Sequence, residues 1–255
     1  MSHRTYRGKL VYLTDGVGEE GREFFTVTVQ PDGSRILRAH CEMDNDHLIR
    51  DVVYALDGDW QPEECFVRLT IGGKHQGSAV FRFTDTHVTC DALTADDGHL
   101  SQSFEVSERV PSFGAHPLCC DTWHSKKGDL VRGESIIGQL RNVALSSPLP
   151  NGGSGPSLSF VGVDVVYAGT EEITVPAGTF KTKHMINQSL RDGGTKPPVE
   201  IWAYSDDFIP VRGRWELLHQ TYELVELSYT DPVAPKDSDA GSSWDRLADF
   251  DKTVG

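Results

Sequence analysis

The sequence lacks the marks of several large protein classes. No stretch approaches the roughly 18 consecutive apolar residues that a membrane helix needs. Basic residues form no stripe along the sequence. The 38 Asp and Glu residues outnumber the 24 Lys and Arg residues, which gives a formal net charge of −14. This acidic surplus argues against nucleic acid and against membrane surfaces as partners, since both are bound through clustered basic side chains.

Cysteine is scarce, and its pattern indicates neither a disulfide framework nor a zinc finger. The five cysteines are odd in number and include no CxxC pair, so reduced thiols are expected. The opening stretch "MSHRTYRGKLVYLTDG" also lacks the apolar run of about 7–15 residues found in a signal peptide. From these two features we expect a cytoplasmic protein.

The familiar catalytic and cofactor motifs are missing too. The sequence shows no glycine-rich phosphate loop, no GxSxG nucleophile elbow, no Rossmann fingerprint and no HExxH. Its histidines do not stand at the spacings of common metal sites. We therefore expect no metal and no cofactor.

Strand patterning is what the sequence has in abundance. Apolar and polar residues alternate in many segments, as in Phe81-Arg82-Phe83, which is typical of antiparallel strands with one buried face. Short turns rich in Gly, Asp and Pro separate these segments. Long helical periodicity is absent. The predicted strands cover residues 5–13, 22–30, 34–43, 48–56, 64–71, 77–84, 87–94, 100–107, 139–149, 157–175, 179–190, 199–205, 209–217 and 222–229.

An antiparallel sheet of about twelve or more strands rarely stays flat, so an all-β fold is expected to curl or close. We predict a single domain over residues 1–230: one large antiparallel β-barrel, or a strongly curved sheet, enclosing a ligand cavity. The irregular segment 110–138 would form a short, partly helical lid or plug. Residues 231–255 are polar and rich in Pro, Ser and Asp, which predicts a mobile tail with one short helix at 243–250.

The segment from Val165 to Leu227 resembles an uncharacterised bacterial β-barrel family, a domain of unknown function. The resemblance rests mainly on "VPAGTF", followed by an apolar strand with Trp and a closing "IPVR" strand. "VPAGTF" has the pattern of a hairpin, in which Pro176 fixes the first turn position and Gly178 supplies a left-handed residue. Such families are similar to lipocalin-like and lipoprotein-carrier barrels, which implies a concave apolar interior.

The stretch "SFGAHPLCCDTWH", residues 112–124, concentrates titratable side chains. His116, Asp121 and His124 at a barrel mouth would form an acid–base set, since imidazole titrates near neutral pH and a carboxylate orients it. Trp123 would contact the ligand. Alternatively, Asp121 only caps a helical turn beginning near Thr122, and His116 only forms a turn. Cys119 and Cys120 are expected to be buried rather than nucleophilic.

Two strands supply further candidates, and the sequence does not decide which face of each strand points inward. In the strand after His47, either His47 and Asp51 face inward as an acid–base pair, or Arg50 and Tyr54 do so as ligand contacts. The third alternative is that the charged residues of this strand lie on an exposed face and form a surface ion pair. In the segment 200–215, Trp202, Tyr204 and Trp215 would wall a planar ligand, with Arg212 as an anchoring cation, or they are core residues.

These patterns favour a cofactor-independent enzyme that acts on a small, largely apolar or aromatic molecule by acid–base chemistry, of lyase, hydratase or isomerase type. Its catalytic residues would be His116, His124, Asp121 and His47. The alternative is a non-catalytic, lipocalin-like carrier for a small hydrophobic ligand, and a structural protein without a pocket is a third reading. The sequence is compatible with a homodimer.

Overall fold

One sheet of 15 strands dominates the computed structural model, which describes residues 3–230. The first eight strands follow one another as a meander. They are β1 (Arg4–Thr14), β2 (Gly18–Val29), β3 (Arg35–Met43), β4 (Leu48–Leu56), β5 (Pro62–Ile71), β6 (Lys74–Phe83), β7 (His87–Thr94) and β8 (Gly98–Glu105). The predicted tail, including the helix expected at 243–250, lies outside the described residues.

A short strand and a helix then interrupt the meander before the remaining strands. They are β9 (Phe113–Gly114), α1 (Leu118–Arg132), β10 (Ile137–Leu145), β11 (Ser159–Val175), β12 (Gly178–Ser189), β13 (Val199–Tyr204), β14 (Ile209–Trp215) and β15 (Gln220–Thr230). Two short 3-10 helices, η1 (Arg191–Gly194) and η2 (Glu216–Leu218), lie among them. Pro176 and Ala177 form the turn between β11 and β12, where Gly178 has φ +140°.

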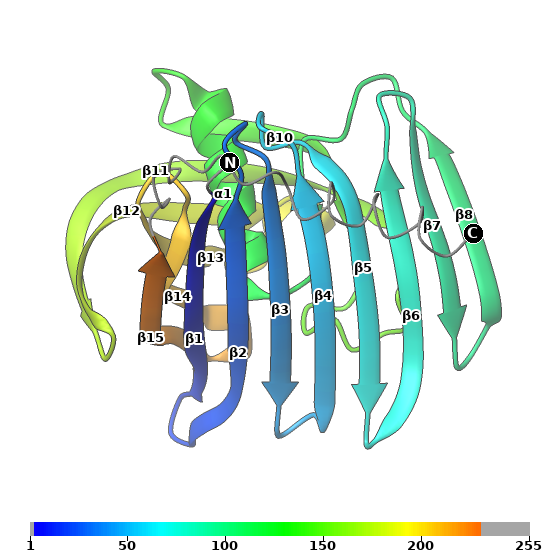
Figure 1. The fold of residues 1–255 in the computed structure, drawn as a ribbon, viewed down its shortest axis with the longest axis horizontal. Helices are drawn as coiled ribbons and strands as arrows, with labels where there is room; N and C mark the ends of the chain where they lie inside the picture. The colour runs from blue at the N-terminus through cyan, green and yellow to red at the C-terminus, as the bar shows by residue number, and fades with distance from the viewer. Residues whose placement is uncertain (1–2, 231–255) are drawn as a thin grey trace, which may run out of the picture.

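The sheet is curved but not closed, so the closed-barrel alternative is wrong. Its strand order runs β8 through β1, then β15 back through β9, and β8 and β9 are its two ends. All pairs are antiparallel except β9 with β10. The first and last long strands, β1 and β15, pair in the middle of the sheet. Figure 1 shows β10–β13 passing behind the N-terminal strands, with α1 in the space between.

Alternation along the strands decides which side chains reach the interior. In β4, Leu48, Arg50, Val52 and Tyr54 are buried, while the side chains between them are exposed or partly exposed. The strand therefore turns its Arg50 face inward, where Leu56 is buried as well.

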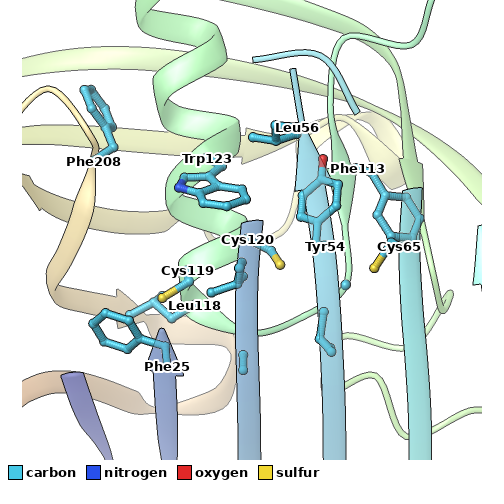
Figure 2. Close-up of a cluster of buried hydrophobic side chains, with 14 of the residues drawn as sticks. Phe25, Tyr54, Leu56, Cys65, Phe113, Leu118, Cys119, Cys120, Trp123 and Phe208 are labelled. Atoms are coloured by element: carbon cyan, nitrogen blue, oxygen red, sulfur yellow. The ribbon is translucent and has the colours of Figure 1, made fainter. Parts of the chain in front are cut away.

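The central helix begins earlier and runs longer than the sequence predicts. It starts at Leu118 rather than near Thr122, and it spans 15 residues inside the fold. Its first nine residues are almost all buried, so no polar stripe marks one side, and this explains why helical periodicity is missing. Figure 2 shows Trp123 and Cys120 projecting from α1 toward Tyr54, beside Phe113.

A side-chain contact links the β8 end of the sheet to the chain that leads into β11. Gln102 of β8 donates from Nε2 to the carbonyl of Leu158 at 3.4 Å and accepts from the Leu158 amide at 2.7 Å. Next to it, the rings of Phe104 and Phe160 meet edge to face at 5.4 Å. The helix fills the space that a closed barrel would enclose, and these contacts hold the open side together.

Candidate functional site

A cavity with two adjoining lobes opens beside the N-terminal turn of α1. The large lobe has a volume of about 470 Å³ and the small lobe about 170 Å³. Their walls come from α1, from the chain between β10 and β11, and from the ends of β13 to β15. Both lobes are lined by His116, Asp121, Leu149, Pro150, Val199 and Trp215.

His124 and Asp121 face each other at the small lobe. They are three residues apart on α1 and so share one side of the helix, with His124 Nε2 3.8 Å from Asp121 Oδ1. On the other side of the ring, His124 Nδ1 shares a 2.6 Å hydrogen bond with Ser112 Oγ, which fixes the ring orientation. The Asp121 side chain is 30% exposed and that of His124 only 6%. The carboxyl thus opens on the cavity, with the imidazole set deeper in its wall.

The surroundings push the pKa values of the two groups apart. Burial lowers the pKa of His124 from 6.5 to about 4, because the imidazolium would lose its water. Burial also raises the pKa of Asp121 from 3.8 to about 8, with Glu23 adding to the rise and Arg50 opposing it. At neutral pH the cavity therefore holds a protonated carboxyl opposite a neutral imidazole.

His116 lies at the turn between β9 and α1 and lines both lobes. Its backbone is left-handed, with φ +76°, directly before Pro117. Its Nε2 is buried without a hydrogen-bond partner among the described residues. Burial, followed by the positive charge of Arg50, lowers the pKa of His116 well below its usual value. His116 therefore adds a second neutral ring to the wall.

Arg50 stands behind this wall rather than in it. Its side chain is buried, and it donates to the carbonyl of Ala115 at 3.0 Å and to the carbonyl of Gly152. Those carbonyls adjoin the two wall segments, His116 on one side and the loop 149–151 on the other. Gly152 has φ +67°, and a Cβ there would overlap the guanidinium. Arg50, predicted to contact the ligand, instead fixes these wall segments in place.

Glu23 of β2 holds the start of α1, a role that the sequence analysis missed. The side chain is fully buried, and its carboxylate accepts from the Leu118 amide at 2.7 Å and from the Tyr12 hydroxyl at 2.9 Å. Burial raises the pKa of Glu23, and these hydrogen bonds oppose the rise. The available signal is its register, because Glu23 shares the inward face of β2 with Phe25 and Val27.

Three predicted site residues from the first half of the chain lie away from the cavity. His47 is exposed in the turn before β4, with φ +50°, so it cannot pair with Asp51 on the inner face. Tyr54 and Trp123 are buried with ring centroids 5.5 Å apart, and neither lines a lobe. They are core residues. Tyr54 lies on the buried face of β4, and Trp123 on α1 packs against it.

The three candidates from β13 and β14 lie on the outer face of the sheet. Ile201 and Ala203 are the buried residues of β13, so Trp202 and Tyr204 point the other way. Arg212 is paired with Trp202 across the two strands and lies on that outer face as well. Of the three aromatic residues predicted to wall the ligand, Trp215 at the end of β14 does line the cavity, and Tyr12 and Tyr222 join it in the large lobe.

The loop between β10 and β11 holds none of the predicted site residues, yet it forms one wall of the cavity. Leu149 and Pro150 line both lobes, and Asn151 lines the large lobe. Ser112, which orients His124, was also missed. A serine with one hydroxyl and no spacing rule gives no sequence signal for such a role.

Cys119 and Cys120, at the start of α1, are buried free thiols. Burial raises the pKa of both Cys119 and Cys120 well above the usual value, so neither is a thiolate at neutral pH. Within residues 3–230, no cluster of three or more His, Cys, Asp or Glu side chains is arranged to hold a metal ion. In the same range, no helix is both long and apolar enough to span a bilayer.

Comparison with known proteins places the architecture in a class. The chain is similar to a β-barrel-like protein of a domain of unknown function, DUF1849, from Brucella abortus, whose crystal structure matches with a TM-score of 0.54. The match covers 90% of this chain and 98% of that one at 11% sequence identity, so it shows the fold alone. Neither a known protein family nor a curated protein matches the sequence. The chain thus has a β-barrel-like fold.

Proposed function

We propose that the protein is a cofactor-independent enzyme that moves protons on a small, largely apolar or aromatic molecule, as a lyase, hydratase or isomerase does. One observation carries the proposal: Asp121 and His124 meet at the cavity with pKa values of about 8 and about 4. Two titratable groups whose surroundings separate their pKa values are the arrangement that assigns one acid and one base.

His124 is the base and Asp121 the acid in this proposal. His124 Nε2 takes a proton from a carbon of the substrate, and the electron pair of that C–H bond forms a double bond as the leaving group departs. Asp121 gives its proton to that leaving group, or to a second carbon in an isomerisation. The pair then consists of an imidazolium and a carboxylate 3.8 Å apart, and proton transfer through one water molecule between them restores the starting state. No electrons enter or leave the protein.

For the carrier alternative we expected an apolar cavity with an anchoring cation such as Arg50 or Arg212, and neither of these two arginines lines a lobe. Arg50 is engaged with two backbone carbonyls, and Arg212 is paired with Glu223 at 2.6 Å. A paired acid and base inside the cavity is the feature that favours catalysis over storage.

The test uses a small-molecule extract of bacterial cells as the probe. Wild-type protein, Asp121→Asn and His124→Gln are incubated with the extract, and consumption of compounds is followed by liquid chromatography–mass spectrometry. We expect a compound that wild type consumes and that each variant consumes about 10²–10⁴-fold more slowly. Its rate should rise through about pH 4 as His124 loses a proton and fall through about pH 8 as Asp121 ionises.

Lys181→Gln, a change on the exposed side of β12 away from the cavity, is the matched control and should act as wild type. A compound that co-purifies with the protein and is never chemically changed by it would contradict the enzyme hypothesis and support the carrier hypothesis. Equal consumption by wild type and both variants, or neither binding nor consumption, would refute the proposal.

A further inference from the structure

The two lobes of the cavity carry opposite charges. Besides the shared Asp121, the charged residues that line the large lobe are Glu20 and Asp46. Of the side chains that the structure describes, those that line the small lobe are Arg191 and Lys196. This is notable in a chain with a formal net charge of −14. Among the residues that the structure describes, lysine and arginine therefore line the small lobe but not the large one.

The small lobe is also the apolar part. Its walls include the apolar side chains of Leu145 on β10 and of Val161 and Val163 on β11. The acid–base pair belongs to α1, whereas the cations belong to η1 and the residues just after it. A molecule in this lobe therefore meets apolar walls, the acid–base pair and a cationic border.

Arg191 also belongs to the structure of the wall. Its Nη1 donates to the carbonyl of Pro148, which lines the same lobe. This contact holds the guanidinium at the border of the lobe, because the Pro148 loop and η1 are joined through it. A guanidinium fixed in this way keeps donors that suit a planar carboxylate.

We propose that the small lobe binds a monocarboxylic acid with an apolar body, its carboxylate at Arg191 and Lys196 and its reacting carbon toward Asp121 and His124. This names the substrate class of the enzyme proposed above and rests on that proposal. A carboxylate fits better than an amine, since the Arg191 guanidinium at the border of the lobe repels an ammonium group. The neutral state of Asp121 removes the negative charge that would otherwise oppose an anion in this lobe.

The test measures binding of three probes that share one phenylpropyl body: hydrocinnamate, hydrocinnamyl alcohol and phenylpropylamine. Isothermal titration calorimetry is run at about pH 6, where Asp121 is protonated. Wild type should bind the acid at least about tenfold more tightly than the alcohol, and the amine most weakly. Arg191→Gln and Lys196→Gln should each lose about tenfold in affinity for the acid and little for the alcohol.

Lys181→Gln controls for the loss of one positive charge elsewhere and should bind like wild type. Melting curves without ligand verify that Arg191→Gln keeps the Pro148 loop folded. Equal affinity for acid and alcohol, or no binding of hydrocinnamate, would overturn the substrate class while leaving the extract test of catalysis untouched. Conversely, preferred binding of the acid together with full activity of Asp121→Asn and His124→Gln would remove the enzyme and keep the ligand class.

Discussion

At the scale of single residues, position rather than residue type sets the chemistry of this cavity. Asp121 and His124 have ordinary pKa values of 3.8 and 6.5, and burial reverses their order to about 8 and about 4. The sequence predicts His116, Asp121 and His124 as a set because they cluster within nine residues of an irregular stretch. It does not predict Ser112 or Glu23 as their supports, because a tertiary contact leaves no local pattern.

The raised pKa of Asp121 predicts a pH-dependent stability. The folded state keeps a proton that the unfolded state loses above about pH 3.8, so Asp121 makes the protein less stable as pH rises from there to about 8. His124 acts in the opposite sense between about pH 4 and 6.5, since its folded pKa is lowered. The unfolding free energy of wild type minus that of Asp121→Asn should therefore fall between pH 4 and 8.

Urea denaturation at several pH values measures this difference, in which His124 and most other groups cancel. The slope should stay below the limit of about 1.4 kcal/mol per pH unit for one proton, because the carboxyl is partly exposed to the cavity. Asp91→Asn, on the outer face of β7, controls for the loss of one carboxylate. A difference that is flat with pH would show that Asp121 is ionised in the folded protein.

At the scale of elements, α1 is held where it is by glycine. A Cβ at Gly128 would overlap the side chain of Val165 on β11, and one at Gly138 on β10 would overlap the carbonyl of Gly128. The helix and the sheet therefore touch backbone to backbone at this point. That close packing positions the helix turn that carries His124.

Gly128→Ala should destabilise the protein even though the same change in an exposed helix would stabilise it by about 1 kcal/mol. The added methyl meets Val165, so we expect a loss of about 1–3 kcal/mol in the free energy of unfolding. Chemical denaturation measures it. Gly133→Ala, where φ is +56° and no atom lies near the added Cβ, separates this overlap from backbone strain alone. A stability equal to or above that of wild type for Gly128→Ala would contradict the packing.

The strands were predictable and the helix was not, for a physical reason. Strands such as β4 and β7 alternate because one face is wet, and this alternation is readable in the sequence. The first half of α1 is enclosed on nearly all sides, so its sequence shows no stripe. A weaker signal was present in Pro117 before the helix and Gly133 after it, the usual punctuation of a helix. The start at Leu118 depends on Glu23, 95 residues away in the chain.

At the scale of the whole molecule, the sheet is curved but open, and side chains of β8 at one end contact the chain at the start of β11. Alternation and strand count predict curvature, but they do not decide between closure and a gap. That choice depends on α1 filling the interior. The contact of Gln102 with the Leu158 backbone takes the place of a strand ladder at the open side.

Gln102→Met should loosen this side alone. It keeps the length of the side chain but leaves the amide and carbonyl of Leu158 without their partner. Hydrogen exchange should become roughly tenfold faster or more in β8 and around residue 158, with β1 to β4 unchanged. Ser103→Ala, exposed on the other face of β8, is the control. Faster exchange across the entire sheet would mean that the gap is not a separate unit.

The pairing of β1 with β15 has a consequence for biosynthesis. Thr5 lies opposite Thr230, so β1 leaves the ribosome more than 200 residues before β15, the strand that covers its second edge. Until then the nascent meander exposes a row of unpaired amides and carbonyls, the kind of surface to which chaperones and other nascent chains attach. A ribosome that stalls before residue 220 therefore releases an aggregation-prone fragment rather than a shortened version of the protein.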